Sequence, residues 1–230
     1  MTLSRSNTRS KPQLVGAACL LLSAPVVIAG TLLTPTLSDD AAAQVAGLTA
    51  HRGAAVAGLT LTSVALLLQV VGIIWLALTA ARNSPKLALA GGAFGVAGAF
   101  IVMFENGIQA SLPSVVSAMS GSSASSATSV VDRIGSSTAA ALDPLSLLGD
   151  LGLILLGVAA IRFGAPRAAA VVLTVGAIAE GAGFGSAMKA LVVVGFALVF
   201  LAAAVIVRAA FARSDARTAT ATQPAQAIGV

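Results

Sequence analysis

Long runs of apolar residues, separated by short segments that carry the charges, make up most of the chain. The clearest run covers residues 53–81, which hold no charged side chain and are followed directly by Arg82. As a helix it would extend roughly 43 Å at about 1.5 Å per residue, more than the roughly 30 Å of bilayer hydrocarbon. The run therefore predicts a membrane-spanning helix.

Five further runs can span a membrane, but two of them must include an acid to reach the required length. The uncharged segment 151–161 is too short to cross by itself, so its span must extend back to Pro144 and take in Asp150. The span that opens at Pro166 must likewise continue past Glu180. We expect an all-α polytopic membrane protein, a bundle of six transmembrane helices, with spans at about residues 14–33, 56–80, 87–108, 144–161, 166–185 and 187–207.

The first apolar run has two interpretations. It is uncharged from residue 12 to residue 38, which is longer than the usual core of a signal peptide and favours a retained span. The alternative is a cleaved signal peptide, because small residues at positions 41–43 follow the run. With the first span retained, residues 1–213 form a single transmembrane domain, and the polar segment 214–230 is expected to be a disordered cytoplasmic tail.

Composition agrees with a membrane protein and excludes two other classes. Hydrophobic residues make up 57% of the chain and charged residues only 9%, too little polar surface for a soluble domain of this size. The apolar runs are continuous rather than alternating, which argues against a β-barrel. The net charge of +5 comes from basic residues placed singly at the ends of apolar runs. This pattern predicts no nucleic-acid partner.

The basic residues also predict an orientation. With the N-terminus inside, ten of the 13 Lys and Arg residues lie inside, and Arg52, Arg133 and Lys189 lie outside. The positive-inside rule then places both termini in the cytoplasm and the protein in the bacterial cytoplasmic (inner) membrane.

Two longer connections are expected on the outer side. In residues 34–53, Ser38 can cap a short amphipathic helix whose first turn holds Asp39 and Asp40. Residues 109–143 are rich in serine between Ser111 and Ser137, and favour a flexible linker with short helices, with a recognition site as the alternative.

Two segments carry a resemblance to a known group of proteins. They are SDDAAAQVAGLTAHRGAAVAG, at residues 38–58, and LDPLSLLGDLGLILLGVAAIRFGAPR, at residues 142–167. Both resemble the corresponding parts of a bacterial family of six-span membrane proteins known only as a domain of unknown function. The likeness covers most of the chain, implies six spans, and implies no activity or functional residue.

Acids inside the bilayer are the residues most informative about function, because they are costly there and usually face a bundle interior. Measured from the basic residue at the end of each span, Asp150 lies roughly 18 Å, and Glu180 and Gln69 roughly 20 Å, into the membrane. These three residues are therefore expected in one polar layer. Glu105 and Asn106 lie farther along their span, at the outer interface.

No Lys or Arg falls in the predicted polar layer. Two carboxylates without a fixed cation should carry a proton or bind a cation, which is the basis for an ion-coupling site. The alternative is structural: each acid is neutral and hydrogen-bonds a neighbouring helix.

Other chemistry is poorly supported. Small-xxx-small pairs, Gly91 with Gly95 and Gly181 with Gly185, favour helix packing over a ligand site. His51 is the only histidine and lies outside the spans, and Cys19 is the only cysteine, so we expect no metal, no cofactor and no enzymatic activity.

The sequence predicts a non-enzymatic structural, partner or regulatory component of the membrane. Its expected surroundings are the lipid bilayer and either another membrane protein or a second copy of the chain. The alternative is a small proton- or cation-coupled transporter that uses the intramembrane carboxylates.

Overall fold

The computed structural model describes residues 11–35, 41–119, 124–186 and 188–222. These residues form seven α-helices and no strand, and six of the helices are long and apolar enough to cross a membrane. The predicted all-α, six-span class is thereby confirmed, and the chain is a multi-pass membrane protein. The helices are α1 (Lys11–Leu33), α2 (Ala41–Ala50), α3 (Arg52–Ala81), α4 (Pro85–Ala118), α5 (Ala124–Arg162), α6 (Arg167–Gly185) and α7 (Lys189–Thr222).

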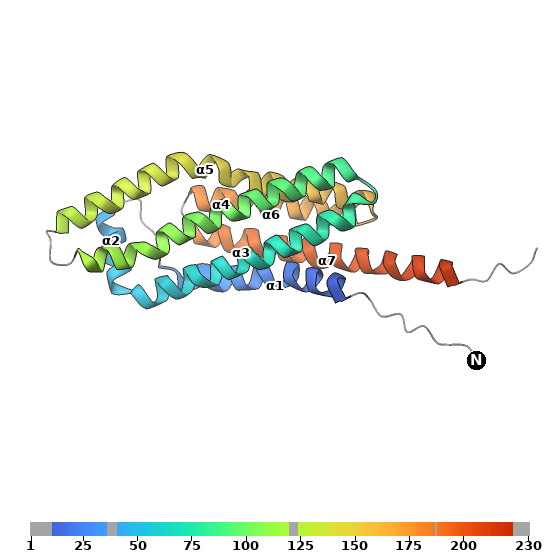
Figure 1. The fold of residues 1–230 in the computed structure, drawn as a ribbon, viewed down its shortest axis with the longest axis horizontal. Coiled ribbons are helices and arrows are strands. Elements are labelled where there is room, and N and C mark those ends of the chain that lie inside the picture. The colour runs from blue at the N-terminus through green and yellow to red at the C-terminus, as the bar shows by residue number, and fades with distance from the viewer. Residues whose placement is uncertain (1–10, 36–40, 120–123, 187, 223–230) are drawn as a thin grey trace, which may run out of the picture.

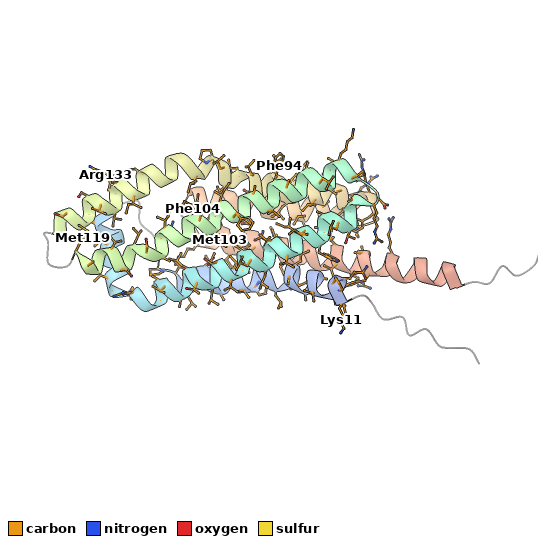
Figure 2. The ribbon with its side chains drawn as sticks, viewed as in Figure 1. Lys11, Phe94, Met103, Phe104, Met119 and Arg133 are labelled. Atoms are coloured by element: carbon orange, nitrogen blue, oxygen red, sulfur yellow. The ribbon has the colours of Figure 1, made fainter. Side chains whose placement is uncertain are left out.

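The six long helices form a closed ring. Each packs against the next along the chain, and α1 packs against α7 to complete the ring. The start of α1 and the end of α7 lie at the same end of the bundle, which we call the terminal end (Figure 1). The opposite end, called the far end, carries α2, the end of α4 and the start of α5. Figure 2 shows Lys11 at the terminal end and Met119 and Arg133 at the far end.

Glycines set the closest helix contacts. A Cβ at Gly72 of α3 would lie 2.6 Å from the Cα of Leu20 of α1, and a Cβ at Gly152 of α5 would lie 2.5 Å from the Cα of Gly95 of α4. Lipid is as apolar as a leucine side chain, so helices in a membrane gain stability by such close backbone packing. The ring therefore depends on glycines at these crossings.

The core is uneven along the bundle. One large cluster of buried apolar residues joins all six spanning helices toward the terminal end, with Leu156 and Ile206 fully buried in it. Toward the far end there are two small clusters. Val27, Ala65, Val192 and Phe196 join α1, α3 and α7, and Ala55, Leu112 and Val131 join α3, α4 and α5.

The serine-rich segment is more regular than predicted. Residues 109–118 continue α4, and residues 124–143 belong to α5, which runs through Pro144 as one helix of 39 residues. The prediction of a flexible linker with short helices is therefore wrong for these residues. Serine hydroxyls bond helix carbonyls, as Ser129 does to Ser126 at 2.9 Å, while Val131 packs against Ala55 and Leu112.

Two other predicted segments have mixed outcomes. The short helix expected in residues 34–53 is present as α2, whereas Ser38, Asp39 and Asp40 lie outside the described residues. The last helix reaches Thr222, so residues 214–222 are helical where a disordered tail is predicted, and residues 223–230 lie outside the described part.

Polar contacts join the connections at both ends of the ring. At the terminal end, Asn83 Nδ2 donates to the carbonyl oxygen of Arg162 at 3.1 Å, and Arg162 Nη1 donates to Ser84 Oγ at 3.4 Å. At the far end, Lys189 Nζ donates to the carbonyl oxygen of Thr34. These bonds link the α3–α4 turn to the α5–α6 turn, and the end of α1 to the start of α7.

Candidate functional site

The register of α5 and α6 brings two acids to the same level. The two helices are antiparallel and joined by the short connection 163–166. Asp150 precedes Arg162 by nearly as many positions as Glu180 follows Arg167, roughly three to four helical turns in each case. Because these two helix segments have nearly the same length and start from the same short connection, Asp150 and Glu180 lie at the same level. Counting residues from the basic residue at the end of each span predicts one layer for both acids. The packing of α5 against α6 makes the two acids neighbours.

Asp150 lies against the backbone of the residue after Glu180. Its Oδ2 occupies the space that a Cβ at Gly181 would need, so any side chain at position 181 would displace the carboxylate. The two carboxylates repel each other when both are ionised. Among the described residues, no hydrogen bond joins them. Because Gly181 has no side chain, the Asp150 carboxylate can approach the α6 backbone next to Glu180.

The backbone of Glu180 is also contacted by α7. A Cβ at Gly195 would lie 2.5 Å from the backbone nitrogen of Glu180 and 2.8 Å from its Cα. At this level α6 is confined between Asp150 of α5 and the backbone of α7. The Oε2 atom of Glu180 is buried and has no hydrogen-bond partner among the described residues. A buried carboxylate oxygen without a partner is costly, and more so in a membrane.

No basic side chain in the described ranges balances these two charges, because neither acid forms an ion pair with a lysine or arginine there. Lys189, the basic residue that follows Glu180 along the chain, is engaged at the far end with the carbonyl oxygen of Thr34. Two carboxylates in this setting can share a proton or hold a small cation between them.

Gln69 belongs to the same level but to another helix. Ile73 of α3 packs on Gly95 of α4, and Gly98 of α4 packs on Gly149 of α5, so the registers place Gln69 near the height of Asp150. Within the part of the chain that the structure describes, no hydrogen bond connects Gln69 to either acid. Asp150 contacts the backbone next to Glu180, whereas Gln69 shares only their level.

Glu105 and Asn106 form a separate polar level. Both lie in α4 beyond the contact of Gly98 with α5, on the far-end side, and both side chains are half-buried. The Nδ2 atom of Asn106 is buried without a hydrogen-bond partner in the described part of the chain. This level is distinct from the Asp150 and Glu180 pair.

The glycines predicted for packing have different surroundings. Gly91 and Gly95 lie in the contact of α4 with α5, and Gly181 lies under the Asp150 carboxylate. Gly185 ends α6, and its surroundings are outside the described side chains. Sequence reasoning missed Gly195, whose close contact fixes Glu180. The small-xxx-small pattern does not identify it, because the residues four positions before and after Gly195 are Leu191 and Val199.

A metal centre has no support in the described residues, because no group of three or more His, Cys, Asp or Glu side chains comes together there. No protein-family model, no curated protein and no solved structure matches the chain. The carboxylate pair and the fold that places it are therefore the basis for the functional inference.

Proposed function

We propose that the chain is a non-enzymatic, multi-pass protein of the bacterial cytoplasmic membrane with both termini in the cytoplasm. Six spans return the chain to the side on which it starts, and both described ends lie at the terminal end (Figure 1). Ten of the 13 Lys and Arg residues belong to that side, against Arg52, Arg133 and Lys189 on the other. The positive-inside rule supports this orientation.

The contacts of α1 support a retained first span. Gly16 of α1 packs on the side chain of Trp75, and Gly30 packs on Thr62, so α1 follows α3 over most of its length. It also contacts α7 and closes the ring. Removing α1 as a signal peptide would open the ring and expose the faces of both neighbours.

Within this class, the geometry best supports a small proton- or cation-coupled transporter. The single observation that carries this inference is the carboxylate pair: Asp150 lies against Gly181, and the neighbouring Glu180 has a buried oxygen without a hydrogen bond among the described residues. A purely structural interface would satisfy that oxygen with a donor. A site that binds and releases a proton or a small cation instead needs an acceptor that is vacant between binding events.

The chemistry of the pair is a change of charge. With one proton shared, Asp150 and Glu180 together carry one negative charge, and binding of a second proton or a monovalent cation brings the pair to neutrality. Loss of charge removes the repulsion between the acids and the cost of holding an ion in lipid. Because α6 is confined by α5 and α7 at this level, the change acts directly on both helix contacts.

A partner or regulatory role is the second candidate, and the far end favours it. Residues 109–118 and 124–143 extend α4 and α5 beyond the predicted spans, and α2 packs against both helices (Figure 1). Ordered helices outside the membrane offer a surface that another membrane protein or a second copy could contact. This role needs no change of charge at the acids.

Proton flux into liposomes tests the transporter. Purified protein is reconstituted, a pH gradient is imposed with the membrane potential clamped, and the internal pH is followed with a trapped dye. We expect Asp150→Asn/Glu180→Gln to slow dissipation of the gradient about tenfold or more, because the acids that would carry the proton are gone. The matched control, Glu105→Gln, removes an acid of the neighbouring level and should leave the rate within about twofold of wild type.

The same assay distinguishes the two candidate functions. A sodium or potassium gradient replaces the pH gradient in a parallel series, so that a cation-coupled site is also detected. If wild type and the double variant dissipate every gradient at equal rates while circular dichroism shows both to be folded, proton or cation flux through these acids is refuted. The partner role is then the surviving proposal.

A further inference from the structure

A groove opens at the terminal end, on the part of the ring formed by α1, α3 and α7. It encloses a cavity of about 580 Å³. Apolar side chains of α1 and α3 make its wall, and polar side chains from the helix ends make its rim. The wall includes Val15, Val71, Ile74, Trp75 and Leu78, and the rim includes Arg82, Asn83 and Arg213.

The wall exposes apolar side chains that suit contact with a hydrocarbon chain. Val71, Ile74 and Leu78 follow one another at spacings of three and four residues, so they form a stripe along one face of α3. Leu78 is 64% exposed and Val15 of α1 is 56% exposed. In a membrane-spanning helix, such exposed apolar surface contacts lipid chains rather than water.

The rim carries two arginines whose guanidinium groups have no acidic partner within the described part of the chain. There, neither Arg82 nor Arg213 makes an ion pair or a side-chain hydrogen bond. By contrast, Arg162 is engaged with Ser84. Arginine presents a planar set of donors that matches the oxygens of a phosphate group.

Arg213 is placed by a glycine in the α5–α6 turn. A Cβ at Gly164 would lie 2.6 Å from Nη2 and 2.7 Å from Nε of Arg213, so the guanidinium group rests on the backbone of this turn. Gly164 has φ +95°, a left-handed conformation that favours glycine. The turn thus provides both the conformation and the space that hold Arg213 at the rim.

We propose that this groove binds an anionic phospholipid. The headgroup phosphate is held by Arg82 and Arg213, and an acyl chain lies along the stripe of Val71, Ile74 and Leu78. Trp75 lies two helical turns before Arg82, roughly 10 Å along the helix. That separation puts the apolar wall just below the level at which the arginines meet the headgroups. Basic pockets between spanning helices on the cytoplasmic side are suited to anionic lipid headgroups.

The charge of the rim identifies the occupant. The chain's own N-terminal segment, residues 1–10, contains Arg5 and Arg9 and no acid, so it has the same sign as the rim. A zwitterionic lipid fills the wall but has no net charge for the two arginines. An anionic phospholipid satisfies both the wall and the rim.

Tryptophan fluorescence offers a direct measurement, because Trp75 is the only tryptophan of the chain and lies in the groove wall. Full-length protein in neutral detergent is titrated with phosphatidylglycerol brominated near the top of its acyl chains, and separately with phosphatidylcholine brominated in the same way. Bromine quenches tryptophan only at close range. We expect quenching at lower mole fractions of the anionic lipid.

Variants of the rim test the role of the arginines. Arg82→Gln and Arg213→Gln should each weaken binding of the anionic lipid about fivefold, the fold-change that corresponds to about 1 kcal/mol per basic residue near an anionic membrane. Arg208→Gln is the matched control, because Arg208 is exposed on the same helix as Arg213 but does not line the groove, and it should leave binding unchanged.

Two results would overturn the proposal. One is equal quenching of the wild type by the two brominated lipids. The other is an undiminished preference for the anionic lipid in the double variant Arg82→Gln/Arg213→Gln. The double variant Arg82→Lys/Arg213→Lys keeps the charge and should keep most of the preference, which separates loss of charge from loss of folding.

Discussion

The terminal half and the far half of the bundle differ in how their helices are packed. In the terminal half, one apolar cluster joins all six spanning helices, and Leu156 and Ile206 are inaccessible in it. In the far half, the core divides into two small clusters. Glu180 and Asn106 have buried polar atoms that find no hydrogen-bond partner among the described residues.

The difference shows where the fold tolerates functional groups. A close-packed core leaves no space for an unsatisfied polar atom, whose burial would cost about 1 to 3 kcal/mol. The terminal half provides the rigidity of the ring, and its hydrogen-bonded turns fix the relative heights of α3, α4, α5 and α6. Because the terminal half fixes these heights, the far half can keep carboxylates at defined positions even though its own core is less closely packed.

The largest effect is expected at the α4–α5 crossing, which belongs to both halves. Gly152→Val places side-chain atoms where the backbone of Gly95 lies, so we expect destabilisation by about 3 kcal/mol or more. The measurement is the unfolding midpoint in mixed detergent micelles titrated with dodecyl sulfate.

The control is a glycine of α4 in open space. A Cβ at Gly107 would meet nothing within 4 Å, so Gly107→Ala should be neutral or stabilise by up to about 1 kcal/mol. Equal losses for the two variants would show that the crossing is not the tight contact described here.

A matched pair of leucines compares the two cores directly. Leu156→Ala removes a side chain that is 0% exposed in the large cluster and should destabilise by about 2 kcal/mol or more. Leu112→Ala in the three-helix cluster should destabilise less, near the lower end of the range of about 2 to 5 kcal/mol, because the few neighbours in a small cluster can move into the space left behind. The same unfolding titration measures both. A larger loss at Leu112 would reverse the ranking of the two halves.

A matched pair of asparagines gives the smallest expected effects, with opposite signs. Asn106→Leu removes a buried amide that has no partner in the described part of the chain and should stabilise by about 1 kcal/mol. Asn83→Leu removes the donor to the Arg162 carbonyl oxygen and should destabilise by about 0.5 to 1 kcal/mol. Unfolding midpoints of the two variants and the wild type are compared in one detergent. Destabilisation by Asn106→Leu would mean that this amide is satisfied in the folded protein.

Much of the fold could be predicted, because a membrane-spanning helix is indicated by the length and apolar composition of one continuous stretch. The stretch of residues 53–81 predicts a spanning helix by its length alone, and α3 covers Arg52–Ala81. The level of Asp150 and Glu180 also follows from counting, because a helix rises by a fixed distance per residue. The serine-rich segment is predicted less well, because its helices are stabilised by contacts such as that of Val131 with Ala55 and Leu112.

Six helical spans, with acids deep inside two of them and Glu105 near the end of a third, follow from the amino-acid sequence alone, because each of these properties depends on the run of residues within one segment. Three contacts, in contrast, emerge only when the helices are packed: Asp150 lies against Gly181, Gly195 confines Glu180, and Arg213 rests on Gly164 beside the groove at the terminal end. These contacts depend on which helices are neighbours and how each is rotated about its axis. In an apolar solvent, hydrophobic periodicity does not specify that rotation, whereas close packing at a few glycines does.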